Sequence, residues 1–440
     1  MKNNSVVTIT ILVWSLVIPL TAQAGHARTD TTPDIITEKE AVAEALAGNP
    51  GIAGMQSRAE AMSHIPSQAG SLPDPLLSLG ALNLPTDSFS TTQENMTQLQ
   101  VGLAQSFPFP GKLGLREQAA HHESDSARFD SDEVRLATVR ETRSRWWSLY
   151  YLDRALGVVQ RNQELLRQFV KIAETKYKTG QGLQSDVLLA QVELSRLLDI
   201  EIDLKASRQG HAAQLNALMD RPAQSPVKLP AQITEQLPAI PDAETLRTEA
   251  MNSRPLLASQ RSRADAAGSR IALAEKDYYP DFTLAGAYGS RSGVNPVNGR
   301  NRSNLASIQL SMTIPLYAGN KQTEAVAQRK AEAAREQFRL TDQMRAVDAE
   351  ISSALADYRA RHSQTALFRT GIIPQASQTV SSMLASYQVN KVDFLNLVRA
   401  QITLYNYETQ YWKAVTAGWQ AWARLEAAVG KEPGKGLIHD

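Results

Sequence analysis

The sequence predicts a mainly α-helical protein in which two tandem copies of a long helical hairpin carry a small β part. Three observations support this fold class: a long proline-free stretch, an internal repeat, and four short segments that read as strands. No proline occurs between Gly111 and Arg221, and Gly180 and Gly182 mark a turn there. The arm before the turn, Leu113–Lys178, would be about 100 Å long as a helix, which is typical of coiled coils and long bundles.

Each arm of this hairpin has its own apolar pattern. In the first arm, apolar residues recur at three- and four-residue steps at Leu166, Val170, Ala173 and Tyr177, which predicts one buried helix face. In the second arm, residues 183–219, leucine and isoleucine are spread around more than one face. A helix of that kind needs neighbours on two sides.

Residues 1–24 have the features of a secretory signal. Lys2 provides a short positive start, residues 6–20 are mostly apolar, and Ala22-Gln23-Ala24 is a small-x-small cleavage site. A single membrane anchor is the alternative, but the apolar stretch is short and contains Pro19. No later window of about 20 residues is apolar enough for a transmembrane helix, so a mature chain that spans a membrane would need strands.

Composition and motifs exclude several chemistries. Lys plus Arg (46) nearly balance Asp plus Glu (45), which gives no support for a nucleic-acid partner. The chain has no cysteine, so disulfides, thiolate metal sites, a cysteine nucleophile and a cysteine-linked lipid anchor are excluded. His121 and His122 are adjacent but diverge on a helix, so we expect no metal site and no cofactor. No hydrolase, zinc-protease or phosphate-loop motif is present, and we expect no enzymatic activity.

The first half of the chain reads as short helices, two strands and the long hairpin. Thr37 and Glu40 form a capping box that opens a short helix, which stops at Gly48-Asn49-Pro50. The elements expected next are a helix and two strands, at 52–69, 76–84 and 98–107. A linker follows the hairpin and is marked by Pro222, Pro226, Pro230, Pro238 and Pro241.

The same order returns in the second half at a nearly constant spacing. The matching pairs are Ser57–Ala61 with Ser262–Ala266, Pro50 with Pro255, Pro75 with Pro280, Tyr177 with Tyr387, and Ala190-Gln191 with Ala400-Gln401. We therefore interpret the chain as a signal, a first repeat, a second repeat and a tail, with bounds 1–24, 25–232, 233–430 and 431–440.

The second repeat is expected to contain strands at 282–288 and 305–314 and helical arms at 319–388 and 391–430. Pro374, with Gly371 nearby, should kink the first of these arms. In the last arm, Val398, Tyr405, Trp412 and Trp419 recur every seven residues. This series is predicted to be core packing between helices rather than an aromatic ligand site.

Two of the expected strands alternate between apolar and polar residues. In 305–314 the even positions from Ile308 onward are apolar, and in 98–107 Leu99, Val101 and Leu103 alternate with polar or small residues. Such strands suit an outer-membrane barrel, and a half-buried strand of a soluble sheet is the alternative. Four strands cannot close a barrel, since the smallest bacterial barrels have about eight. The membrane interpretation therefore implies oligomerisation.

Taken together, these features resemble the TolC-type outer-membrane efflux proteins over essentially all of the mature chain. Specific matches are Pro315–Gly319 before the second long helix and Tyr177–Gly180 at the first hairpin turn. Within the family, Pro73–Pro75, Asn83–Pro85 and Gln105–Lys112 are most similar to the heavy-metal branch of CzcC- and CusC-like proteins.

The resemblance implies a homotrimer in the bacterial outer membrane, with twelve strands in one shared barrel and the helices forming a tunnel, or α-barrel, through the periplasm. It also implies a periplasmic adaptor (membrane fusion) protein that contacts the hairpin turns and couples the duct to an inner-membrane, proton-driven RND pump. The positions that would contact the adaptor are Tyr177, Gly180, Leu183, Tyr387, Asn390 and Val392. The alternative is that these residues only close the turns, a role expected of Gly180 in any case.

This sequence departs from the family pattern in two places. Family members can constrict the periplasmic mouth with paired aspartates on the last hairpin, whereas the matching positions here are Asn396 and Arg399. Asp186 occupies the equivalent site in the first copy, so charge remains at the mouth but the closure chemistry does not transfer. Many relatives also carry an N-terminal lipidated cysteine, which this chain lacks.

We interpret the chain as the passive exit duct of a tripartite exporter of heavy-metal cations. One alternative is a duct for drugs or secreted polypeptides. The other is a soluble periplasmic coiled-coil adaptor or scaffold.

Overall fold

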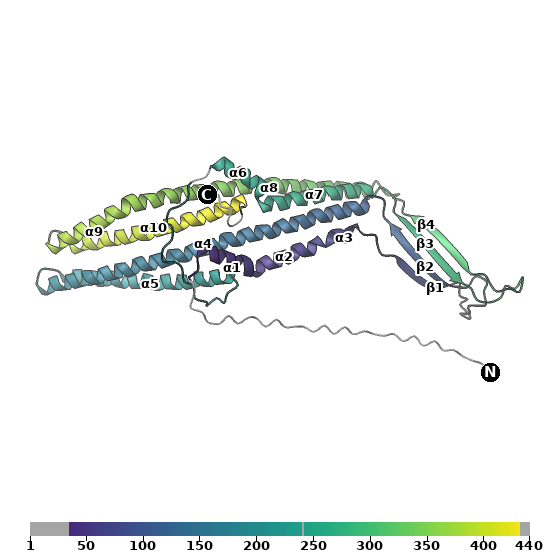
Figure 1. Ribbon diagram of the computed structural model, residues 1–440, viewed down its shortest axis with the longest axis horizontal. Helices are drawn as coiled ribbons and strands as arrows, with labels where there is room; N and C mark the ends of the chain where they lie inside the picture. Colours follow the sequence, from purple (N-terminus) through teal and green to yellow (C-terminus); the bar gives the residue numbers. More distant parts are fainter. Residues whose placement is uncertain (1–34, 240–241, 432–440) are drawn as a thin grey trace, which may run out of the picture.

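The protein is an elongated body with helices along most of its length and a small sheet at one end (Figure 1). The computed structural model describes residues 35–239 and 242–431. The turns of two long helical hairpins lie at the end opposite the sheet. The predicted fold class, long helical hairpins with a small β part, is therefore confirmed.

In the first half, short helices precede two strands and a long hairpin. These elements are α1 (Glu38–Gly48), α2 (Pro50–Ser63), α3 (Ile65–Gly70), β1 (Leu76–Leu82), β2 (Gln98–Phe107), α4 (Lys112–Lys178) and α5 (Gln184–Leu218). The predicted capping box is present, because the Glu40 carboxylate accepts the Thr37 N–H at 2.8 Å and Thr37 Oγ1 accepts the Glu40 N–H at 3.3 Å. The prediction of a single helix at 52–69 is wrong, because the structure has two helices there, α2 and α3. The helix breaks at His64, since Pro66 lies in the first turn of α3 and has no N–H to donate.

The second half repeats this order with one difference in the long arm. Its elements are α6 (Ala243–Ser253), α7 (Pro255–Lys276), β3 (Phe282–Ser290), β4 (Leu305–Met312), α8 (Gln322–Leu367), the π-helical η1 (Phe368–Ile372), α9 (Ile373–Gln388) and α10 (Phe394–Val429). The element order expected from the repeat is present in both halves. The repeat bounds 25–232 and 233–430 stay a prediction.

The irregularity predicted at Pro374 takes the form of a π-helical turn. Segment η1 lies directly before Pro374, which occupies the first turn of α9. Proline cannot donate a hydrogen bond to the preceding turn, and a wider turn accommodates this loss. The corresponding helix α4 runs for 67 residues without such a break.

The four strands form one antiparallel sheet in the order β1-β2-β3-β4. The register places Leu77, Leu103, Gly286 and Ile308 in one row, and Leu79, Val101, Tyr288 and Ala306 in another. The alternations predicted for the two strands therefore coincide on a single apolar face. This face is exposed, with Leu79 at 77% and Ile308 at 85% of full exposure. Within the described residues, β1 and β4 each leave one edge unpaired.

Aromatic side chains pack where the two hairpins meet. Trp147 of α4 stacks on Trp419 of α10 with ring centroids 5.1 Å apart, and Tyr150 meets Trp412 edge-on at 6.1 Å. Val398, at the other end of the seven-residue series, is buried against α4 and α9. The series along α10 is thus core packing between helices, as predicted.

The apolar face predicted along α4 is correct except at its last member. Leu166 and Ala173 are buried, and Val170 packs against the same cluster. Tyr177, however, is 48% exposed, whereas Lys176 is only 9% exposed. A helical period of 3.6 residues allows either position to follow Ala173, and the second hairpin lies on the side of Lys176.

Across the described ranges, no helix combines the length and the apolar character needed to cross a bilayer. The predicted signal, 1–24, and residues 432–440 of the predicted tail lie outside those ranges.

Candidate functional site at the hairpin turns

The two turns that join α4 to α5 and α9 to α10 lie at the same end of the molecule (Figure 1). They have the same backbone hydrogen bonds. The Gly180 N–H donates to the Tyr177 carbonyl at 3.0 Å, and the Asn390 N–H donates to the Tyr387 carbonyl at 3.1 Å. The repeat therefore extends to the detailed geometry of the turns.

Left-handed backbone closes both turns. The φ angle is +71° at Gly180 and +60° at Asn390. Glycine and asparagine are the residues that adopt this conformation most readily. Gly180 thus has the turn-closing role that the sequence predicts, and Asn390 has the same role in the second copy.

A buried lysine joins the two turns. Lys176, in the last turn of α4, donates from Nζ to the Tyr387 carbonyl at 2.6 Å and to Asn390 Oδ1. The same ammonium group lies 4.4 Å from the centre of the Tyr387 ring, within the range of a cation–π interaction. One side chain of the first hairpin therefore holds both the backbone and the ring of the second turn.

Tyr387 is the anchor on the other side of this contact. The residue is 5% exposed, and its ring lies 5.1 Å from the ring of Phe394, the first residue of α10. Burial, together with the neighbouring Asp186 carboxylate, raises the pKa of Tyr387 to about 12. The phenol therefore stays protonated at neutral pH and can donate its proton toward an acceptor.

Asp186, in the first turn of α5, lies in the same cluster. Burial and the nearby Asp393 carboxylate raise its pKa, while the Leu183 backbone, the Tyr387 hydroxyl and the Lys176 ammonium act in the opposite direction. The two turns thus bring two carboxylates, one ammonium group and one phenol together, with the carboxylates repelling each other.

The remaining predicted positions lie around this cluster without joining its core. Tyr177 and Leu183 are exposed on the first turn, and Val392 is half-buried on the second. Asn396 and Arg399 are exposed in the first turns of α10. The structure therefore brings Asp186, Tyr387 and Asn390 together and leaves the other predicted residues at the surface.

Sequence reasoning missed Lys176 and Asp393. A lysine is rarely buried without a partner, so helical spacing alone favoured its apolar neighbour Tyr177 for the buried face. The sequence did contain one indication of the burial of Lys176. Residues three apart lie on the same helix face, so Lys176 shares the buried face of Ala173. Asp393 precedes α10 as its N-cap residue, a common place for aspartate that carries no functional signal by itself.

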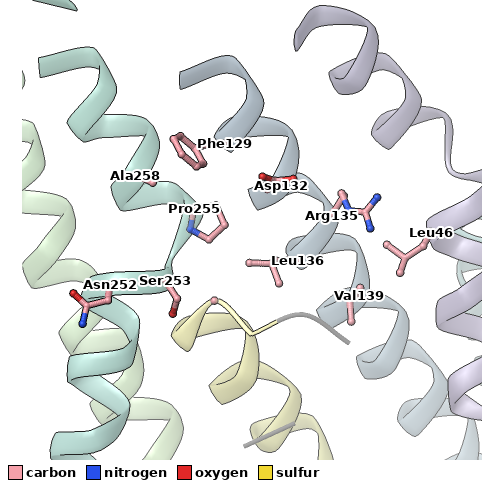
Figure 2. Close-up of a pocket in the computed structure, with 11 residues that line it drawn as sticks. Leu46, Phe129, Asp132, Arg135, Leu136, Val139, Asn252, Ser253, Pro255 and Ala258 are labelled. Atoms are coloured by element: carbon pink, nitrogen blue, oxygen red, sulfur yellow. The ribbon is translucent and has the colours of Figure 1, made fainter. Parts of the chain in front are cut away.

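A second candidate site is a cavity of about 400 Å³ in the middle of the body, shown in Figure 2. Its walls come from α1, α4, α6 and α7 and from Gly430 after α10. Leu46, Leu136 and Val139 make one side apolar, with Asp132 and Arg135 on the same helix α4. Within residues 35–239 and 242–431, no three His, Asp or Glu side chains gather as a metal site requires. The charged network at the turns links the two hairpins directly and is the stronger candidate site.

Comparison with known proteins identifies the family. A family model described as outer membrane efflux protein matches residues 41–221 and again 246–431. BepC, an outer membrane efflux protein of Brucella suis, is 23% identical over 72% of this chain and 67% of its own length. The cobalt-zinc-cadmium resistance protein CzcC of Cupriavidus metallidurans is 21% identical over 83% of this chain and 82% of its own.

A solved structure has the same fold. The outer-membrane channel OprN superimposes with a TM-score of 0.76 at 17% identity, covering 90% of each chain. Proteins of this family are channels and not enzymes, which confirms the expectation that the chain has no enzymatic activity. Because the family model covers most of both halves, the chain belongs to the outer membrane efflux protein family.

Proposed function

We propose that the chain is the outer-membrane exit duct of a tripartite efflux system and acts as a homotrimer. The observation that carries this proposal is the four-stranded sheet, whose apolar face is exposed and whose outer strands β1 and β4 have free edges in the described part. Four strands are about half of the smallest bacterial barrel, and three copies supply twelve. Closing such a barrel removes the free edges and places the apolar face in lipid.

The helix α5 supports assembly at the other end of the molecule. Leu197 of α5 faces the interior of the protomer, whereas Leu188, Val192 and Ile202 are exposed on the opposite side of this helix. Exposed apolar residues in such a row are typical of a surface that a partner covers. A neighbouring copy in a helical tunnel is the partner that this proposal places there.

The hairpin turns are the proposed contacts with a periplasmic adaptor protein, through which the duct couples to an inner-membrane RND pump. Tyr177, Leu183 and Val389 are exposed at the tips and offer apolar contact area. Gly180, Asn390 and Val392 shape the same surface. An adaptor that docks on these tips would separate the turns and open the periplasmic mouth.

Closure of the mouth is proposed to depend on the contact between the turns. Asp186 and Tyr387 lie together in it, and Asn396 and Arg399 lie nearby on α10. The transport path itself needs no bond-making chemistry, so the energy must come from the pump.

Heavy-metal cations are the proposed cargo. Support comes from the similarity to CzcC and from the segments Pro73–Pro75 and Gln105–Lys112, which resemble the heavy-metal branch. A deletion strain challenged with zinc, cobalt, cadmium, copper, silver and several drugs tests this choice. Sensitivity to metals is expected, and sensitivity to drugs alone would favour the alternative of a drug or polypeptide duct.

The trimer can be tested by disulfide trapping, because the chain has no cysteine of its own. If the seam between copies repeats the β2–β3 register, Ile308 of one copy lies opposite Ala81 of the next. The double variant Ile308→Cys, Ala81→Cys should then form covalent trimers on oxidation. Within one copy, β1 and β4 are separated by two intervening strands, about 14 Å, which is too far for a disulfide.

A matched control places the second cysteine on the opposite face of β1. The pair Ile308→Cys, Gly80→Cys should form far fewer covalent trimers. Detergent extraction completes the test: a duct stays in the outer-membrane fraction as an oligomer. A chain that washes out of that fraction as a monomer would support the soluble adaptor or scaffold instead.

A further inference from the structure

An arginine-rich hollow lies on the wall formed by the helices next to the sheet. In this wall α4 packs between α2 and α7, and α7 packs between α4 and α8. The hollow has a volume of about 330 Å³. Six arginines are among the residues that line it: Arg58 of α2, Arg263 and Arg270 of α7, and Arg329, Arg335 and Arg339 of α8. We call this feature the arginine hollow.

The positive charges of the arginine hollow are only partly neutralised. Four carboxylates pair with its arginines: Asp130 with Arg263, Glu123 with Arg270, Glu332 with Arg329, and Glu336 with both Arg335 and Arg339. Arg58 makes no ion pair with any residue that the structure describes. Six guanidinium groups thus face four carboxylates, and the hollow keeps an excess of positive charge.

Glu336 holds two of these arginines in place. It is 7% exposed, accepts a hydrogen bond from Gln260 Nε2 at 2.9 Å, and contacts Arg335 at 2.7 Å and Arg339 at 3.2 Å. Burial opposes its ionisation, but the hydrogen bond and the two guanidinium groups outweigh burial and lower the pKa of Glu336. The two arginines are therefore oriented before any ligand arrives.

We propose that the arginine hollow binds a multivalent oxyanion of the phosphate class. Guanidinium groups present paired N–H donors that match the oxygens of a phosphate group, and several of them around one hollow can share a multivalent anion. On α8, Arg335 and Arg339 lie about one helical turn apart and Arg329 lies six residues before Arg335, while Arg58 is contributed by α2. A free divalent cation would be repelled from the same place.

The hollow also has a defined side. Side chains from α2 and α8, the two outer helices of the wall, reach it together, which requires the concave side of the wall. This placement rests on the proposed function, because three copies closed into a duct turn the concave side toward the lumen. The duct would then carry an arginine belt that attracts anions and repels free cations, which counts against free heavy-metal cations as the cargo and favours an anionic cargo or metal ions in anionic complexes.

Calorimetric titration of the purified full chain in detergent with inorganic pyrophosphate tests the proposal. Saturable binding is expected at low ionic strength and should weaken in high salt. Arg58→Gln and Arg329→Gln should each weaken pyrophosphate binding about tenfold, since each removes a charge-assisted hydrogen bond. Glu332 keeps a hydrogen bond from Gln328 when Arg329 is replaced, so folding should be unaffected.

The matched control is Arg167→Gln on α4. Arg167 pairs with Glu164 three residues away, as Arg329 does with Glu332, but it lies outside the hollow. Its replacement should leave pyrophosphate binding unchanged. Equal weakening by Arg167→Gln, or no saturable binding by the wild-type chain, would overturn the proposal.

A second titration distinguishes a free anion from a lipid headgroup. Dihexanoyl phosphatidic acid carries the same phosphate chemistry on a short lipid, and binding of this lipid without binding of pyrophosphate would also overturn the proposal. The oligomeric state is read from the same sample by light scattering. A trimer that binds no pyrophosphate would refute the arginine hollow alone, whereas a monomer that binds it would refute the duct alone.

Discussion

The two hairpins derive from the same repeating pattern, yet they differ in continuity. Helix α4 is one helix of 67 residues and carries Trp146, Trp147 and Tyr150 into a fully buried cluster. Its counterpart is divided into α8, η1 and α9, and no residue of η1 is buried. The first hairpin thus provides a continuous, well-packed support, while the second contains a wide turn that can change shape at lower cost.

The turns show the same division. Tyr177 of the first turn is exposed, whereas Tyr387 of the second is buried against Lys176 and Phe394. The contact between the turns therefore uses Tyr387 of the second turn and Lys176 of the first, and Tyr177 takes no part in it. The two turns share their backbone hydrogen bonds but differ in which side chains make the contact between the hairpins.

The largest expected effect comes from the support in the first hairpin. Trp146→Ala should lower the free energy of unfolding by about 3–5 kcal/mol, because a fully buried indole is lost. Its Nε1 also donates to the Ile36 carbonyl at 3.0 Å. Chemical denaturation followed by circular dichroism measures the change. Phe368→Ala in η1 is the comparison and should cost less than half as much; equal costs would contradict the difference between the hairpins.

The second-largest effect is expected from the contact between the two hairpins. Lys176→Met should weaken the contact by about 1.5–3 kcal/mol, since hydrogen bonds from a charged group to the second turn are lost. Hydrogen exchange should speed up at residues 386–393. The control Lys178→Met replaces an exposed lysine on the same helix end and should leave exchange unchanged. Unaltered protection in Lys176→Met would show that packing alone holds the turns together.

A smaller effect is expected from the turn geometry. Gly180→Ala should cost about 1 kcal/mol, because φ is +71° there although the site has open space. Gly268 is the matched control, since it also has open space but lies inside helix α7 with an ordinary φ. Gly268→Ala should stabilise the chain by up to about 1 kcal/mol. Melting temperatures that move in the same direction would contradict this reasoning.

The smallest effect is a pH dependence at the cluster. Because the pKa of Asp186 is raised in the folded chain, the native state binds more protons than the unfolded state in the pH window between 3.8, the usual value for aspartate, and the raised value. Its contribution to stability is therefore largest at low pH and falls as pH rises through this window. Asp186→Asn should flatten that part of the melting-temperature profile, whereas Asp199→Asn, an exposed position on the same helix, should not.

Patterns that are local in sequence predicted most of the fold. The absence of proline from Gly111 to Arg221 predicted the helical hairpin of α4 and α5. The alternation of apolar and polar residues around Val101 and Ile308 predicted which side chains form the apolar face of the sheet. The break at His64 was missed because Pro66 lies within an otherwise helical pattern, where a proline can either kink a helix or end it.

The candidate site was predictable only in part. Gly180 and Asn390 follow from the turn chemistry of single residues, so the sequence contains their role. Lys176 links the two turns by donating to the Tyr387 carbonyl, which is more than 200 positions away in the sequence, and no local pattern reveals such a contact. The arginine hollow is similar, since Arg58 and Arg339 line one hollow only because α2, α4, α7 and α8 pack in series.

The wide turn at Phe368–Ile372 also determines the direction in which the side chains of the following helix, α9, point around the helix axis. Each residue added to or removed from a helix rotates the following side chains by about 100° about its axis. Tyr387 points toward Lys176 only with the present count of residues between α8 and the tip. Shortening η1 by one residue would turn Tyr387 away from its partner while leaving both hairpins helical, so a single deletion there could uncouple the tips without unfolding them.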